Sequence, residues 1–404
     1  MSLWRAANTI VFAALVLFAP APVLAQDKTG MEEFEEVDPY TRGEPELMDR
    51  LGYVSFGPFH WRDGDSTTAV QENMGGVPML WVETEHFRIG STLNTYKLSG
   101  DADEKTRLKK ELARLKEKLG KLKAPKRELD PWLRLHLFAQ RAEELYAAFL
   151  TDFDLRPQDF SELGPHLGQP HKFPILLCER MSEYSRHMST YVGVQSETLY
   201  RWGWYESCMG FGINVERLRQ AWSGGGDIPF DTVLYCRLAA SLSINFIDGF
   251  RGCFYGAPTW LARAHAHRSV RSIDPRWVNE AGYRDGQNIR EDDYKWEPRV
   301  QKLVKNDFFA PSMEMFAWKA YADMDVRDHM VAWSRLDYLL DEAEGDRRGF
   351  LLDLCQPAPS GDEEQSRALM VARQTKSLSE RFEFLPEELD KSWARWVKKT
   401  YSKR

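Results

Sequence analysis

The sequence predicts an α+β fold that is rich in helices, with a small mixed sheet packed on one core helix. Three observations lead to this prediction. A long charged segment carries a thin leucine stripe at helical spacing. Several short segments are apolar or alternate with the period of a strand, and one apolar segment, residues 232–247, is long enough to be a buried helix.

The first half of the chain supplies one strand and two long helices. Residues 79–89 alternate well enough to predict a single strand that enters the fold. Residues 103–121 predict a helix, and a second helix is predicted from Pro131, a residue favoured in a first turn, to about Leu150. The stripe of the first helix consists of Leu108, Leu112, Leu115 and Leu119.

The middle of the chain supplies the remaining strands and the core helix. Residues 174–178 predict a short buried strand, followed by a helix that begins near Ser182. The aromatic and glycine-rich segment 198–215 predicts a hairpin. Asp231 is expected to cap the core helix, which runs from Thr232 to about Ile247.

The last third of the chain is predicted to be helical. One helix begins near Trp260, and residues 328–354 predict two helices that are broken near Gly345. A segment rich in proline and small residues, 357–362, precedes a final helical stretch.

The N-terminus has the features of a secretory signal. Arg5 precedes an apolar run over residues 9–18, and small residues at Val23 and Ala25 predict cleavage before Gln26. The run is shorter than the about 20 residues that span a bilayer. We therefore expect export across the inner membrane, to the periplasm or to the outside.

The composition of the chain argues against one class of partner and against a fold held together by many disulfides. The formal net charge of −7 argues against nucleic acid, which requires a clustered basic surface. Five scattered cysteines are too few for a disulfide scaffold, although an oxidising compartment leaves room for one or two bridges and an odd thiol. They are Cys178, Cys208, Cys236, Cys253 and Cys355.

The segment after the core helix resembles the active site of gluzincin-type zinc metallopeptidases of the peptidase-MA-like group. Pro258, Trp260 and Leu261 fit the family's P-x-W-L-x-E-G segment, in which the glutamate is the third zinc ligand. In that family the preceding helix carries H-E-x-x-H, and the predicted order of elements is also similar. The resemblance implies a zincin-like architecture for residues 78–325, after a signal (1–25) and an acidic extension (26–77), with a helical subdomain at 326–404.

None of the family's four chemical residues is present. The alignment places Ser241 and Asn245 at the two histidine positions, Leu242 at the catalytic glutamate and Arg263 at the third ligand. Zinc requires imidazole, thiolate or carboxylate donors, and a guanidinium stays protonated. Leucine cannot take a proton from metal-bound water. The resemblance therefore implies a vestigial site with no metal and no cofactor.

What remains of such a fold is a groove that could bind an extended peptide by strand addition. The resemblance thus implies an exported pseudo-peptidase with a peptide or protein ligand. Arg263 is expected to fill part of the vacated site and to pair with Asp248 or another carboxylate, because a buried guanidinium must be compensated. Aromatic residues could line the groove, although such residues more often fill a core. They are Trp202, Trp204 and Tyr205.

Two other functions stay open. An active hydrolase could use His265 and His267, or Asp328 and His329, in which case several of these side chains would converge in a pocket. Two histidines at i and i+2 diverge by about 200° on a helix, and acidic clusters such as the one near His329 more often cap a helix. The third alternative is a structural protein of the cell envelope that has no discrete ligand.

Overall fold

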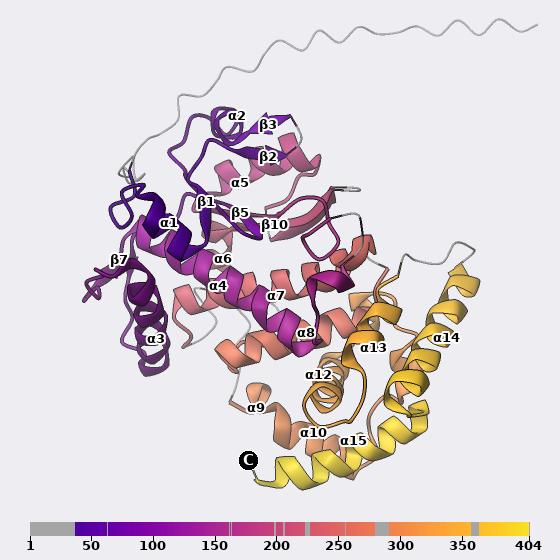
Figure 1. The fold of residues 1–404 in the computed structure, drawn as a ribbon. Coiled ribbons are helices and arrows are strands. Elements are labelled where there is room, and N and C mark those ends of the chain that lie inside the picture. Colours follow the sequence, from indigo (N-terminus) through magenta and orange to yellow (C-terminus); the bar gives the residue numbers. More distant parts are fainter. Residues whose placement is uncertain are drawn as a thin grey trace, which may run out of the picture. The chain divides into compact units, whose positions relative to one another are not determined.

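The structure is a computed structural model that describes residues 37–62, 64–160, 162, 164–197, 199–204, 207–222, 227–254, 256–278, 291–356 and 363–403. These residues belong to one contact unit. The predicted signal, Tyr205 and the segment 357–362 lie outside the described residues. The predicted α+β class is confirmed, because a mixed sheet is combined with many helices, as Figure 1 shows.

The main sheet has the strand order β1-β4-β5-β8-β10-β9. Its central strand β8 is parallel to both neighbours, whereas the outer pairs are antiparallel. At one edge, β9 pairs through Arg201 with Phe211 of β10. The strands are β1 (Tyr53–Ser55), β4 (Leu80–Thr84), β5 (Phe87–Ser91), β8 (Phe173–Cys178), β9 (Tyr200–Trp204) and β10 (Cys208–Asn214). Two small sheets pair β2 (His60–Arg62) with β3 (Asp65–Ser66) and β6 (Tyr96–Lys97) with β7 (Glu128–Leu129).

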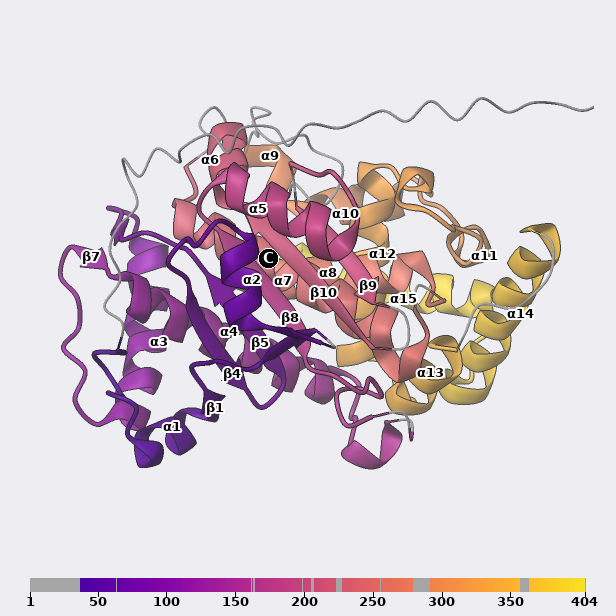
Figure 2. The ribbon, with the colours of Figure 1, turned by 90° about the horizontal axis from the view of Figure 1, so that it is seen from above.

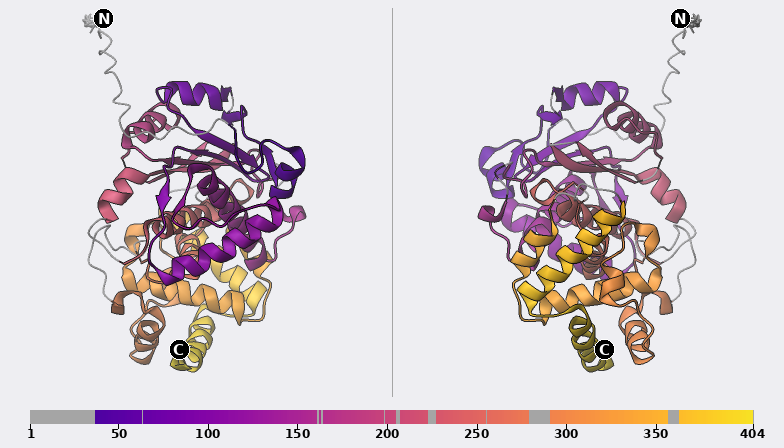
Figure 3. Two further views of the ribbon diagram at one scale, coloured as in Figure 1. Left: turned by 90° about the vertical axis from the view of Figure 1, so that its left-hand side faces the viewer. Right: turned by 90° about the vertical axis from the view of Figure 1, so that its right-hand side faces the viewer.

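Helices cover both faces of the main sheet. α4 and α7 pack on one face, and α5 packs on the other, where α2 lies against it (Figures 1 and 2). Behind α7 the layers continue with α8 and then α12, so that the orange and yellow C-terminal helices lie on the α7 side in Figure 3. The helices of the first half are α1 (Pro45–Leu51), α2 (Thr67–Asn73), α3 (Ala102–Leu119), α4 (Pro131–Asp152), α5 (Met181–His187), α6 (Val215–Trp222) and α7 (Phe230–Gly249). Those of the second half are α8 (Thr259–Ile273), α9 (Glu291–Tyr294), α10 (Trp296–Lys305), α11 (Ser312–Met315), α12 (Val326–Asp341), α13 (Arg347–Leu354), α14 (Glu363–Phe382) and α15 (Pro386–Thr400).

Periodicity predicted the long helices and the strands β8, β9 and β10, but not α1, α2 and β1 to β3, which lie in the segment expected to be an extension. The four leucines of the α3 stripe are buried, and α4, α5, α7 and α8 begin within a few residues of their predicted starts. The predicted hairpin is the antiparallel pair β9–β10, and the break near Gly345 separates α12 from α13.

The prediction of one strand over residues 79–89 is wrong, because the chain reverses at Glu85 and His86 to form the antiparallel pair β4–β5. The backbone N–H and ring Nδ1 of His86 contact the two carboxylate oxygens of Glu143 on α4, at 3.1 and 2.7 Å. This long-range contact stabilises a turn that lacks glycine, asparagine or proline. Apolar alternation continues on both sides of the turn, so the sequence pattern does not reveal the reversal.

The prediction that Asp231 caps α7 is also wrong. Pro229 is at the N-cap, and the carboxylate of Asp231, which is almost fully buried, receives hydrogen bonds from Arg141 at 2.9 Å and Arg134 at 3.4 Å. Arg141 also binds Glu111 of α3 at 2.8 Å. Asp231 therefore belongs to a buried ionic network that joins α3, α4 and the first turn of α7.

The N-terminus of α12 agrees with the expectation from the sequence. Asp325 caps α12 by accepting backbone hydrogen bonds from Arg327 and Asp328, which is the capping role expected of the acidic cluster. Within the described ranges, no helix combines the length and apolarity that a bilayer crossing would require.

Candidate functional site

The candidate site lies on the face of α7 that turns toward β9. Ser241, Asn245 and Asp248 are spaced so that they share one side of the helix. α7 is packed beneath β10 and β9 and is buried along most of its length, including Leu242 (Figures 1 and 2). The helix therefore lies between the sheet and α8, at the centre of the fold.

Arg201 of β9 crosses from the sheet to this face of α7. Its Nη1 donates to Oδ1 of Asn245 at 3.0 Å and to Oδ2 of Asp248 at 2.9 Å. The side chain of Arg201 is 17% exposed and that of Asp248 is 9% exposed. A guanidinium from the edge strand thus covers one of the two aligned histidine positions and the carboxylate one turn beyond it.

The electrostatics of Asp248 follow from this contact. Burial raises the pKa of the carboxyl group above its ordinary value, and the charge and hydrogen bond of Arg201, with a further contribution from Arg263, act in the opposite direction. The ion pair is therefore what keeps a charged carboxylate tolerable in this buried setting.

Arg263 does not form the expected ion pair with Asp248, although its charge acts on that carboxylate. The guanidinium bonded to Asp248 is that of Arg201, while the Cζ of Arg263 lies 4.8 Å from the centroid of the Tyr321 ring. The reason is geometric. β9 passes over the α7 face, whereas Arg263 extends from α8 toward the segment that precedes α12.

The motif residues that carry the resemblance anchor α8. Pro258 is the N-cap residue of α8, and Trp260 and Leu261 are fully buried. The indole Nε1 of Trp260 donates to Oε1 of Gln374 on α14 at 2.7 Å. These contacts explain the three residue types by packing alone.

The two tryptophans proposed for the groove lie on the other face of the sheet. Successive strand residues point to opposite faces, and Arg201 points toward α7. Trp202 and Trp204 are accordingly buried on the α5 side, with their ring centroids 5.7 Å apart. Trp204 donates to the backbone oxygen of Tyr191 at 3.2 Å. They do not line the α7 face.

The histidines proposed for an active hydrolase do not converge in one pocket. His265 lies 3.2 Å from a carboxylate oxygen of Asp152. Nε2 of His267 lies 3.0 Å from Nδ1 of His329, at the α8–α12 contact. The carboxylate of Asp328 instead accepts the backbone N–H of Asp325.

Both members of the His267–His329 pair are buried and neutral. Burial, assisted by the charge of Arg263, lowers the pKa of His329 to about 3 and the pKa of His267 well below its ordinary value. One neutral imidazole can donate to the other, which satisfies both facing nitrogens. Because the pair is packed inside the protein, its geometry favours a structural role.

Acidic, histidine and cysteine side chains do not gather into a metal site in the described segments. No group of three or more such residues with suitable placement occurs there. The aligned positions on α7 and α8 carry a hydroxyl, an amide and a guanidinium, which do not fit the donor set of zinc.

A cavity of about 500 Å³ lies at the start of β9. Arg237, one of its lining residues, precedes Ser241 by one turn on the same face of α7. Arg217, on α6, is exposed at the cavity. Neither arginine was predicted from the sequence, although the four-residue spacing of Arg237 from Ser241 was a usable signal. The other lining residues are Leu199, Ile213, Asn214, Leu218, Gln220 and Ala221.

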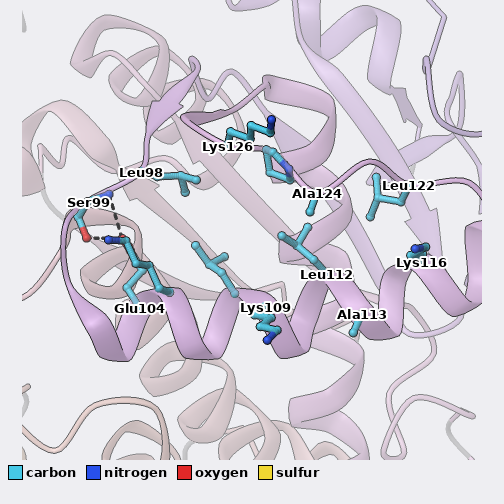
Figure 4. A pocket seen from close by; sticks show the side chains of 13 residues that line it. Leu98, Ser99, Glu104, Lys109, Leu112, Ala113, Lys116, Leu122, Ala124 and Lys126 are labelled. Atoms are coloured by element: carbon cyan, nitrogen blue, oxygen red, sulfur yellow. Dashed lines mark hydrogen bonds between the residues drawn. The ribbon is translucent and has the colours of Figure 1, made fainter.

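A second cavity, of about 580 Å³, lies between α3 and the segment that follows it (Figure 4). Its lining includes the apolar side chains of Leu98, Leu112 and Leu122. Lysines, among them Lys109 and Lys116, also line it. Its one lining carboxylate, Glu104, is buried and accepts hydrogen bonds from Ser99 and Tyr96. No part of the cavity is formed by α7.

Comparisons with family models, with curated proteins and with solved structures find no match to this chain. The gluzincin resemblance therefore stays a prediction, carried by Pro258, Trp260 and Leu261 and by the order of elements. The Arg201 contact with α7 does not depend on it.

Proposed function

We propose that this chain binds a peptide, or an extended segment of another protein, along β9 and does not hydrolyse it. The observation that carries the proposal is the contact of Arg201 on edge strand β9 with Asn245 and Asp248 on the core helix. The contact holds edge strand β9 beside the helix face that corresponds, in the gluzincin alignment, to the metal site of the family.

Loss of hydrolysis follows from the chemistry of this face. Ser241, Asn245 and Arg263 do not provide the donors that zinc requires, and Leu242 cannot act as a general base. The guanidinium of Arg201 adds a positive charge over Asn245, and like charges repel strongly in a partly buried site. A divalent cation would have to displace it.

Binding by strand addition needs an accessible strand edge. Within the described residues β9 has a strand partner on one side only, β10. An edge strand presents unpaired backbone N–H and C=O groups that can pair with an extended ligand. Tyr200 and Gly203 are exposed on this strand, so that a ligand can approach it.

The chemistry of the ligand follows from the cavity at the start of β9. Arg217 and Arg237 supply guanidinium groups there, beside the apolar side chains of Leu199 and Leu218. Guanidinium groups bind carboxylates with paired, charge-assisted hydrogen bonds. We therefore propose an extended peptide that places an acidic side chain or a C-terminal carboxylate in this cavity.

The proposal can be tested with a library of extended peptides in which each acidic peptide has a partner carrying amides in place of carboxylates. Hydrogen exchange is then measured with and without the best binder. Strand addition should protect the backbone amides of β9, while β1, at the opposite edge of the same sheet, serves as the internal control. The peptide should be recovered intact.

Four results would overturn the proposal. Cleavage of the bound peptide, or one tightly held zinc ion per chain after incubation with zinc and dialysis, would contradict the absence of hydrolysis. Protection located away from β9, or no binder in the acidic half of the library, would contradict the proposed binding mode.

A further inference from the structure

Cys253 and Cys355 meet beside the C-terminal end of α7. The Sγ of Cys253 lies 3.4 Å from the backbone oxygen of Asp248 and 3.6 Å from that of Ile247. The Sγ of Cys355 lies 3.7 Å from the same Ile247 oxygen. The two thiols therefore contact the same carbonyl oxygen, that of Ile247. Their segments are far apart in sequence, since Cys253 precedes α8 and Cys355 ends α13.

We propose that Cys253 and Cys355 form a disulfide bond when the protein folds in an oxidising environment. Two sulfur atoms that contact one carbonyl oxygen are close neighbours, and they must approach each other to about 2.05 Å to form a disulfide. Both side chains are almost fully buried, so the bond would lie inside the packed structure.

The bond would fasten the end of α13 to the turn between α7 and α8. It closes a loop of about 100 residues, and long loops are those whose closure most restricts the unfolded chain. The fastened turn follows Asp248, the residue that Arg201 binds. The cross-link would thus stabilise the helix end that carries the candidate site.

The chemistry requires a disulfide oxidant, such as oxidised glutathione. One cysteine loses its proton and its thiolate attacks the oxidant, forming a mixed disulfide and releasing one glutathione. The second cysteine, also deprotonated, attacks the protein sulfur of the mixed disulfide and releases the second glutathione. The protein loses two electrons and two protons, and oxidised glutathione gains both as two thiols.

The burial of the thiols determines when the disulfide can form. Burial raises the pKa of the Cys355 thiol well above its ordinary value, so little thiolate exists in the folded protein. We expect the bond to form while the chain folds, when both thiols are still accessible to the oxidant.

The test is to refold the reduced, unfolded full chain in a glutathione redox buffer, unfold it again in denaturant and label its free thiols with N-ethylmaleimide. Of five cysteines, three should be labelled, Cys178, Cys208 and Cys236, and a peptide map should contain the 253–355 cross-link. Reduction should then lower the denaturant concentration at the midpoint of unfolding.

Cys236→Ser is the matched control, because it removes another buried thiol and should keep the cross-link and the effect of reduction. Cys355→Ser should abolish both. Labelling of all five thiols in the refolded wild-type chain, or a cross-link between any other pair, would overturn the proposal. The wild-type peptide map decides this even where a variant fails to fold.

Discussion

Arg201 on β9 and Asp248 on α7 form an ion pair in which Nη1 and Oδ2 are 2.9 Å apart, and the same Nη1 donates to Asn245. The pair joins the edge strand of the sheet to the core helix. If the gluzincin alignment is correct, a protein cation has replaced a metal cation at this face, and the carboxylate that balances it lies one turn beyond the aligned position.

Replacing Arg201 with methionine should lower the free energy of unfolding by about 2 kcal/mol. The substitution leaves Asp248 buried without its cation, although partial solvent access moderates the loss. Urea denaturation at neutral pH measures the effect. Arg114→Met is the control, because the Arg114–Glu144 pair is largely exposed and should contribute less than about 1 kcal/mol. Equal losses in both variants would contradict the structural importance of the Arg201 contact.

Asp231→Asn should be more damaging, with a loss of about 3–5 kcal/mol in the free energy of unfolding, because it leaves Arg141 with one buried carboxylate instead of two. Combining it with Arg141→Met should give less than the sum of the two single losses, since both substitutions remove the same Arg141–Asp231 ion pair, which can be lost only once. A double-mutant cycle by chemical denaturation measures this coupling, and strictly additive losses would show that the network does not exist.

The free energy of unfolding should fall as the pH drops below about 6.5. Burial lowers the pKa of His187 to about 3, and its Nε2 accepts the indole N–H of Trp61 at 3.0 Å. Because the folded-state pKa is lowered, the unfolded chain binds the proton first. The contribution of neutral His187 is therefore complete above pH 6.5 and is lost as the pH falls toward 3.

The variant His187→Gln isolates this effect, because the amide oxygen can still accept the Trp61 hydrogen bond. It should reduce the pH dependence by about 1.4 kcal/mol per pH unit between pH 6 and 4. Urea denaturation at a series of pH values measures the slope. A slope identical to that of the wild type would show that His187 does not stay neutral in the folded protein.

Arg217→Glu should weaken binding of acidic peptides at least about tenfold, because it replaces an exposed guanidinium at the β9 cavity with a like charge to the ligand. Binding of the amide-substituted peptides should change much less. Fluorescence polarisation at two salt concentrations measures both. Arg50→Glu, a charge reversal at an exposed position of α1, is the control and should leave the affinity unchanged. Equal effects at the two positions would point to general attraction between charges.

Local patterns predicted the helices well and the sheet less completely. The α3 stripe and the wide apolar face of α4 depend only on side chains three or four residues apart. The turn between β4 and β5 depends on Glu143, and the position of Asp231 depends on Arg134 and Arg141. Such long-range contacts leave no periodic signal in the sequence.

The residues of the candidate site were likewise predicted only in part. Ser241, Leu242 and Asn245 could be placed on one helix, and their inability to support zinc chemistry is a property of the residue types. Arg201 was not identified, although it alternates with Tyr200 and Trp202 in a predicted strand. Only the pairing of β9 with β10 shows that its side chain reaches α7.

The sequence by itself determined the positions of the long helices, the burial of the core helix and the absence of zinc donors at the aligned positions, because these follow from spacing along the chain and from side-chain chemistry. The tertiary structure decided which arginine binds Asp248 and which two cysteines meet. Those pairings join segments that are distant in sequence, and only the packing of the sheet and helices brings such segments together.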